Sequence, residues 1–103
     1  MGLKKQYLKS KPECKVTFTL PKEALLNAKK VTLVGEFNNW SKSKTPMKKM
    51  ENGSASVSLN LKTGREYQYR YLINGKIWEN DWEADKYVAS SIPGVENSVV
   101  ILS

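Results

Sequence analysis

The stretch EYQYRYLINGKIW, residues 66–78, indicates the fold class more clearly than any other part of the sequence. Large apolar side chains fall at every second position, which is the period of a β-strand with one buried face. These inward positions are Tyr67, Tyr69, Tyr71 and Ile73. Asn74 and Gly75 then favour a tight hairpin turn, because both residue types readily adopt positive φ. The stretch therefore predicts two antiparallel strands joined by a short turn.

Similar short apolar patterns, separated by turn signals, recur along the rest of the chain. Only residues 22–29 have helical character, and that segment is too short for a stable helix on its own. Asn52-Gly53 favours a type I′ hairpin turn. The predicted strands are residues 14–20, 30–37, 45–50, 54–61, 66–73, 76–80, 86–90 and 97–102. Seven or eight short strands with almost no helix predict an all-β sandwich.

The composition excludes several kinds of functional site. The chain has 103 residues, enough for one domain with its own core, and contains one cysteine and no histidine. An internal disulfide, a zinc site of Cys and His ligands and a Ser-His-Asp triad are thus excluded, and no metal or cofactor is expected. Cys14 is interpreted as a small buried apolar residue. A free thiol, with no secretory signal and no apolar run of membrane-spanning length, favours a cytoplasmic location and no membrane partner.

The formal net charge of +7 is concentrated near the N-terminus. Residues 1–15 contain five lysines and one glutamate, whereas the remainder contains twelve basic and nine acidic residues. We therefore expect residues 1–12 to form a solvated basic arm and residues 13–103 to form the sandwich domain. An anionic partner for the arm, including nucleic acid, stays an open alternative.

An acidic run near the end of the chain is the strongest candidate for catalytic carboxylates. Its members are Glu79, Asp81, Glu83 and Asp85. A glycoside hydrolase needs two carboxyl groups on opposite sides of the scissile bond, whereas these four lie in one predicted loop. We interpret them as a charge-balancing surface. Since no glycine-rich phosphate loop is present either, the sequence predicts that the chain is not an enzyme.

Three tryptophans lie outside the inward-facing strand positions, at strand ends or in loops. Trp82 is interpreted as a ring that folds over the edge of the sandwich. Trp40 and Trp78 are candidates for exposed rings that contact a ligand. A flat indole suits the apolar C–H face of a sugar ring, whose rim of hydroxyl groups needs hydrogen-bond partners.

Polar side chains near the two candidate tryptophans could provide those hydrogen bonds. Arg70 and Gln68 lie on the outward face of the tyrosine-rich strand, and Asn97 begins the last predicted strand. The same groups could also stack and bind nucleobases, so a nucleic-acid ligand stays open. For Arg70 the alternative is a surface cation that pairs with Glu79 or Glu66 on a neighbouring strand.

Three segments resemble a known family of binding modules. They are VTLVGEFNNWSKSKTPMKK, YQYRYLINGKIWEND and GVENSVVIL. Together they resemble the family 48 carbohydrate-binding module, the glycogen-binding domain of the AMP-activated protein kinase β-subunit and of the region preceding the catalytic domain in branching enzymes and isoamylases. The resemblance covers residues 15–102 and is greatest to stand-alone bacterial members. It implies an immunoglobulin-like (early-set) β-sandwich that binds α-1,4-glucan.

The resemblance also implies roles for individual residues. Trp40 and Trp78 match the tryptophans that stack on glucose rings. Arg70 matches a hydroxyl-binding lysine of the kinase subunits, and Asn97 matches a hydroxyl-binding asparagine. Val95 stands where the kinase subunits have a hydroxyl residue.

One departure from the family pattern affects the hairpin before Trp78. Compared with the family pattern, that hairpin contains one additional residue. This residue is expected to place the Trp78 side chain on the opposite face of the sheet, unless a β-bulge accommodates it. The W-x-x-D spacing between Trp78 and Asp81 is retained.

The sequence thus predicts a non-catalytic carbohydrate-binding module for glycogen or a similar α-glucan, with a glycogen-metabolising enzyme as a candidate partner. Its carbohydrate-binding residues would be Trp40, Arg70, Trp78 and Asn97, with Gln68 and Val95 as further candidates. Two alternatives stay open. One is a protein-interaction module of the same fold that no longer binds sugar, and the other is a nucleic-acid-binding domain that uses its lysines.

Overall fold

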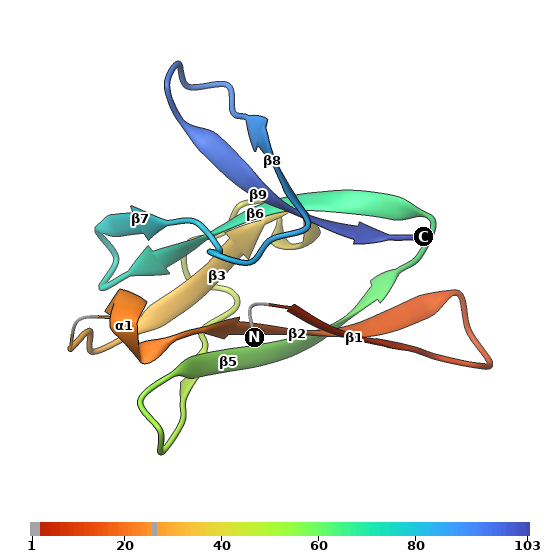
Figure 1. Cartoon of the computed structure of the whole chain (residues 1–103), viewed down its shortest axis with the longest axis horizontal. Coiled ribbons are helices and arrows are strands. Elements are labelled where there is room, and N and C mark those ends of the chain that lie inside the picture. The colour runs from red at the N-terminus through yellow and green to blue at the C-terminus, as the bar shows by residue number, and fades with distance from the viewer. Residues whose placement is uncertain (1–2, 26) are drawn as a thin grey trace.

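Two antiparallel β-sheets pack face to face in the computed structural model, which describes residues 3–25 and 27–103 (Figure 1). Sheet A has the order β1 (Leu3–Tyr7), β2 (Glu13–Leu20), β5 (Ala55–Lys62), β4 (Lys48–Lys49). Sheet B has the order β3 (Val31–Gly35), β6 (Arg65–Ile73), β9 (Glu96–Leu102), β8 (Lys86–Ala89), and β7 (Ile77–Glu79) also pairs with β6. The helices are α1 (Lys22–Leu25) and a 3₁₀ turn, η1 (Glu36–Asn38). The prediction of an all-β sandwich is confirmed, with nine strands among the described residues.

The N-terminal segment differs from the solvated arm that the charge distribution predicted. Residues 1 and 2 lie outside the described residues, but Leu3–Tyr7 form β1, which pairs with β2 over its whole length. Lys5 also forms an ion pair with Asp85, with 2.7 Å between Nζ and Oδ2, and Asp85 lies just before β8 of sheet B. Lys4 and Lys5 are therefore held on sheet A, whereas Lys9 and Lys11 lie in the exposed turn that follows β1.

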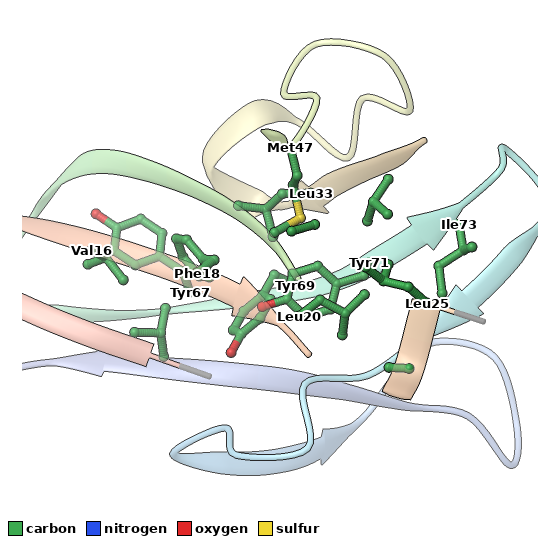
Figure 2. Close-up of a cluster of buried hydrophobic side chains, with 14 of the residues drawn as sticks. Val16, Phe18, Leu20, Leu25, Leu33, Met47, Tyr67, Tyr69, Tyr71 and Ile73 are labelled. Atoms are coloured by element: carbon green, nitrogen blue, oxygen red, sulfur yellow. The ribbon is translucent and has the colours of Figure 1, made fainter. Parts of the chain in front are cut away.

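The space between the sheets is filled by the alternating residues that the sequence predicted to face inward (Figure 2). Phe18 of β2 packs edge-on against Tyr69 of β6, with ring centroids 5.0 Å apart and an interplanar angle of 74°. Such aromatic pairs stabilise a fold by about 0.5–1.5 kcal/mol beyond the burial of their surface. Cys14 is completely buried at the same interface, as predicted.

Strand β6 is the centre of sheet B and has partners on both edges. Tyr69 pairs with Gly35 of β3 on one edge and with Ser98 of β9 on the other. Further along the strand, Tyr71 pairs with Leu33 of β3 and with Glu79 of β7. Strands β7 and β9 therefore share the edge of β6 that lies opposite β3, one following the other along it.

The outer face of sheet B is covered by side chains. Val34, Leu72 and Val99 occupy outward positions of β3, β6 and β9, yet each is at most 3% exposed and lies outside the main core cluster. Arg70 and Gln68 lie on this same face, because they alternate with the inward-facing tyrosines. Residues on this face can therefore be held in fixed positions, as a binding site requires.

Candidate binding site

A hollow of about 490 Å³ opens on sheet B at the junction of β7 and β9. Of the described residues, those that line it are Arg70, Trp78, Asn80, Gly94, Val95 and Glu96. One wall is thus formed by β7 and the residue after it, and the other by the loop that leads into β9. The structure brings together three predicted site residues in this hollow, which are Arg70, Trp78 and Val95.

The hairpin between β6 and β7 accommodates the additional residue in its turn, without a bulge in either strand. Ile73 pairs with Ile77, and the three residues between them form the connection. Asn74 and Gly75 adopt positive φ values of 53° and 70°, which turn the chain tightly. Trp78 consequently pairs with Leu72 and lies on the same face as Arg70, so the predicted reversal of its face does not occur.

Arg70 contacts the indole of Trp78 directly. Its guanidinium carbon lies 4.6 Å from the centroid of the Trp78 ring, which is a cation–π contact. Burial lowers the pKa of the Arg70 guanidinium, and its Nε atom is buried without a hydrogen-bond partner. The alternative of an ion pair with Glu79 or Glu66 is not observed among the described residues. Glu66 pairs with Lys86 instead, and Glu79 accepts a hydrogen bond from Trp82.

Asn97 and Gln68 form a hydrogen-bonded pair on the same outer face. The Asn97 amide nitrogen donates to Gln68 Oε1 at 3.0 Å, and this bond fixes the Asn97 side chain across two strands. Asn97 Oδ1 is buried without a partner. Leaving a buried acceptor unsatisfied costs about 1–3 kcal/mol, so this atom is a candidate for contact with a bound ligand.

Trp40 lies in the turn after η1, on the β3 side of β6, and is not among the described residues that line the hollow. Its N–H donates to the Gly35 carbonyl at 2.8 Å. Asn38 closes the same turn, since its buried amide accepts from Gly35 N–H and donates to the Leu33 carbonyl. Because β3 and β7 flank β6, Trp40 and Trp78 lie on opposite sides of this strand, and each is 37% exposed.

Trp82 does not fold over the sandwich edge, so this interpretation is wrong. Its side chain is 53% exposed, and its indole N–H donates to Glu79 Oε2 at 3.1 Å. A local hydrogen bond three residues back along the chain holds the ring outward. The sequence could not show this, because a tryptophan near an acidic residue is compatible with either orientation.

Asp81 is buried and is not part of a charge-balancing surface, which corrects the interpretation of the acidic run. The residue is 2% exposed, and its carboxylate accepts from the hydroxyls of Tyr69 and Tyr71, at 2.7 and 3.3 Å. It also accepts from the Glu83 N–H at 2.9 Å. The backbone carbonyl of Asp81 accepts from the Tyr87 hydroxyl. This carboxylate therefore connects the loop after β7 to the aromatic core.

A short relay of hydrogen bonds joins the two walls of the hollow. Asn80 donates to the Glu96 carbonyl at 2.9 Å and accepts from the Ser98 hydroxyl at 2.7 Å. The Ser98 oxygen in turn accepts from the Asp81 N–H at 2.9 Å. Sequence reasoning missed Asn80 and Glu96 as lining residues and Ser98 as their support. In the sequence, only the W-x-x-D spacing from Trp78 to Asp81 pointed to this part of the site, because Asn80 lies within that motif.

The buried tyrosines make an alkaline transition predictable. Burial raises the pKa of Tyr69 and Tyr71 above the ordinary value of 10.0, and the neighbouring Asp81 carboxylate adds to both shifts. Because ionisation is favoured in the unfolded chain, their contribution to stability is complete below pH 10 and is lost as the pH rises above it. We expect phenolate absorbance from these two residues to appear together with the loss of β-sheet circular dichroism. Ionisation of all five tyrosines before any unfolding would contradict this expectation.

A small β-sandwich with an aromatic and polar hollow on one outer face has the arrangement of a ligand-binding module. Residues 7–100 match the protein family described as the glycogen recognition site of AMP-activated protein kinase. The chain therefore belongs to this family of carbohydrate-binding modules, as its sequence motifs indicated. Among residues 3–25 and 27–103, no helix is long and apolar enough to cross a membrane.

Several curated proteins are similar to the chain. It is 35% identical over 79 residues to Protein PTST homolog 2, chloroplastic, of Arabidopsis thaliana, an alignment that covers 75% of this chain and 13% of that protein. It is 36% identical over 73 residues to the 5'-AMP-activated protein kinase subunit beta-1 of Sus scrofa, covering 71% and 55%. It is 41% identical over 59 residues to the 1,4-alpha-glucan branching enzyme GlgB of Aquifex aeolicus, covering 54% and 8%. The matched region thus spans between 8% and 55% of these relatives.

Proposed function

We propose that the chain is a non-catalytic module that binds an α-1,4-glucan, such as glycogen, on the outer face of sheet B. In this proposal Trp40 and Trp78 stack on glucose rings on either side of β6. Arg70 and Asn97 form hydrogen bonds with sugar hydroxyls, and Gln68 orients Asn97. Val95 provides an apolar contact for a C–H face.

The observation that carries the proposal is a pair of unsatisfied buried atoms beside an indole-lined hollow. Arg70 Nε is a donor and Asn97 Oδ1 is an acceptor, and neither has a hydrogen-bond partner. A sugar hydroxyl can accept from the first and donate to the second. Both atoms are covered in this structure, so sugar binding would require side chains at this face to shift, including the Arg70 guanidinium on the Trp78 ring. Such cation–π contacts are worth only about 0.5–2 kcal/mol, which makes the shift accessible.

The partner and location belong to the same proposal. The similar proteins include a branching enzyme and a kinase subunit, and both names refer to proteins longer than the region matched here. We therefore propose that this chain brings a glycogen-metabolising enzyme to its glucan. The cytoplasmic location stays a prediction from the single free cysteine.

The direct test is a titration of the full chain with maltoheptaose or β-cyclodextrin, followed by calorimetry and by NMR shifts of the tryptophan side chains. We expect binding in the micromolar to millimolar range. Trp40→Ala and Trp78→Ala should each weaken it about tenfold, because a stacking contact contributes about 1.4 kcal/mol. Added salt should change the affinity little, whereas contacts with nucleic-acid phosphates weaken steeply with salt.

Trp82→Ala is the matched control, since Trp82 is more exposed than either proposed stacking residue but does not line the hollow. It should retain the affinity within about twofold, well below the loss expected from a stacking residue. Absence of binding at millimolar sugar, or equal losses in all three variants, would count against a glucan site at this face.

A protein-interaction module is the second candidate function. The observation that favours it is the exposure of Ile77 and Trp82 on either side of Trp78 in the sequence, at 58% and 53%. Exposed aromatic and aliphatic groups can form the centre of a protein interface. Stoichiometric capture of one purified enzyme that is lost in Trp78→Ala and unaffected by maltoheptaose would support this function over glucan binding.

A further inference from the structure

The outer face of sheet A carries a cluster of lysines that the proposed glucan site does not use. According to the strand register, each of the four strands carries a lysine at an outward position. These are Lys4 of β1, Lys15 of β2, Lys62 of β5 and Lys48 of β4. All four are exposed, and the ion pairs formed among the described residues, Lys5–Asp85 and Lys86–Glu66, involve none of them. At the outward positions of the described strands of sheet A, Glu13 is the only acidic residue. We refer to this surface as the lysine face.

The two layers of the sandwich differ in charge. Residues 3–25 and 48–62, which include every strand of sheet A, contain nine lysines and three glutamates. Residues 63–103, which include four of the five strands of sheet B, contain four basic and six acidic residues. The net charge of +7 is therefore distributed asymmetrically across the thickness of the molecule and is not confined to its N-terminus.

Small hydroxyl side chains occupy the middle of the lysine face. Thr17 and Thr19 of β2 lie opposite Ser58 and Ser56 of β5, and the hydroxyls of Thr17 and Ser58 are 2.8 Å apart. Four strands and eight residues per long strand give an open surface about 15 Å wide and 27 Å long. Hydroxyls and ammonium groups spread over such a surface can all contact phosphate oxygens.

The composition of the lysine face does not suit a protein or nucleic-acid partner. Protein interfaces are depleted in Lys and Ser and depend on aromatic or Arg anchors, and the outward positions of the four strands provide none. A broad flat face cannot enter a DNA groove, which admits a helix or a two-stranded ribbon, so a duplex would meet it only through backbone phosphates on one curved side. Single strands need aromatic rings for stacking. An anionic bilayer requires only a cluster of four to eight basic residues near its surface.

We propose that the lysine face binds the surface of a bilayer that contains anionic phospholipids. The interaction is peripheral and electrostatic, because the outward positions of the described strands of sheet A carry no large apolar side chain. Lys9 and Lys11, in the turn between β1 and β2, extend the basic surface at one end. This proposal does not depend on glucan binding and can fail or succeed separately from it.

The charge asymmetry also defines an orientation on the bilayer. Packed sheets lie about 10 Å apart, which is close to the Debye length of about 8 Å at physiological salt. The anionic surface therefore attracts the basic layer more strongly than it repels the acidic layer, which lies further away. Sheet B then faces away from the lipid, which leaves the hollow at Arg70 and Trp78 open to solvent.

The test is co-sedimentation of the full chain with vesicles of phosphatidylcholine alone and of phosphatidylcholine mixed with phosphatidylglycerol. We expect binding only to the mixed vesicles and its loss at high salt. The double variant Lys15→Gln/Lys62→Gln should bind about 25-fold more weakly, since each lysine contributes about fivefold. Circular dichroism checks that the variant is folded, which is expected because both side chains are exposed.

The matched control is Lys42→Gln/Lys44→Gln, which removes the same charge from exposed positions after η1. It should leave vesicle binding within about twofold of the original, because these lysines lie off the face. The proposal is overturned if the mixed vesicles bind no protein or if the control weakens binding as much as the first variant. It is also overturned if duplex DNA at equal phosphate concentration displaces the protein from the vesicles.

Maltoheptaose binding to the vesicle-bound protein with unchanged affinity would support the orientation, and loss of that binding would contradict it.

Discussion

Replacement of Asp81 by alanine is expected to lower the free energy of unfolding by about 3–4 kcal/mol. The change removes the acceptor of two buried phenol hydroxyls, those of Tyr69 and Tyr71, and of the Glu83 N–H. The two phenol hydroxyls would then lack this acceptor at a site that water does not reach. Because 1 kcal/mol shifts Tm by about 4–8 °C in a domain of this size, Tm should fall by about 15–25 °C.

Chemical and thermal denaturation, followed by circular dichroism, measure this effect. Asp81→Asn keeps an amide oxygen that can accept one of the hydroxyls and should cost about 1–2 kcal/mol. Glu51→Ala, at an exposed position between β4 and β5, removes the same charge and should change stability by less than about 0.5 kcal/mol. A cost below about 1 kcal/mol for Asp81→Ala would show that the hydrogen bonds to the tyrosines contribute little.

Replacement of Gly35 by alanine is expected to cost about 3 kcal/mol, at the upper end for an overpacked site. A Cβ atom at this position would lie 2.7 Å from the Gln68 carbonyl oxygen and 2.8 Å from Tyr69 Cβ. Its φ of −170° is accessible to any residue, so the cost arises from these contacts and not from backbone strain. Strands β3 and β6 would have to separate, which would also disturb the hydrogen bond between Trp40 and Gly35.

Gly64→Ala provides the comparison. Gly64 has φ of 81°, which alanine adopts with strain, but an added Cβ meets no atom within 4 Å. Its expected cost is about 1–2 kcal/mol. Denaturation midpoints of the two variants therefore separate steric overlap from backbone strain. If Gly64→Ala is the more damaging change, the close approach of β3 and β6 is not the reason for glycine at position 35.

The fold was predictable where strand periodicity and turn residues agreed. The tyrosine alternation of β6 and the turn at Asn74-Gly75 are both local properties of the sequence, and both occur as predicted. Asn52-Gly53 did not form the predicted type I′ turn, since only Gly53 has positive φ and Asn52 instead bonds to Ser54. Strand β1 was missed because its lysines hide the alternation, and its stability comes from pairing with β2.

The candidate site was predictable in its residue types but not in its contacts. Arg70, Trp78 and Val95 meet in one hollow, but their approach depends on the three-residue turn and on the relay from Asn80 to β9. Burial of Asp81 depends on phenol hydroxyls contributed by β6, ten and twelve residues earlier in the chain. Sequence periodicity describes which face a residue occupies, whereas these contacts depend on how separate segments pack.

The placement of β7 and β9 along one edge of β6 affects how the module could evolve. One wall of the hollow is β7 with the residue after it, and the other is the loop at residues 90–95, which joins β8 to β9. The loop at residues 90–95 can lengthen or shorten without shifting β6, β7 or the aromatic core behind them. Homologous modules could therefore change the width of the hollow through short insertions in this loop that leave the sandwich unchanged. Under the proposed function, such insertions would alter which glucans the module binds.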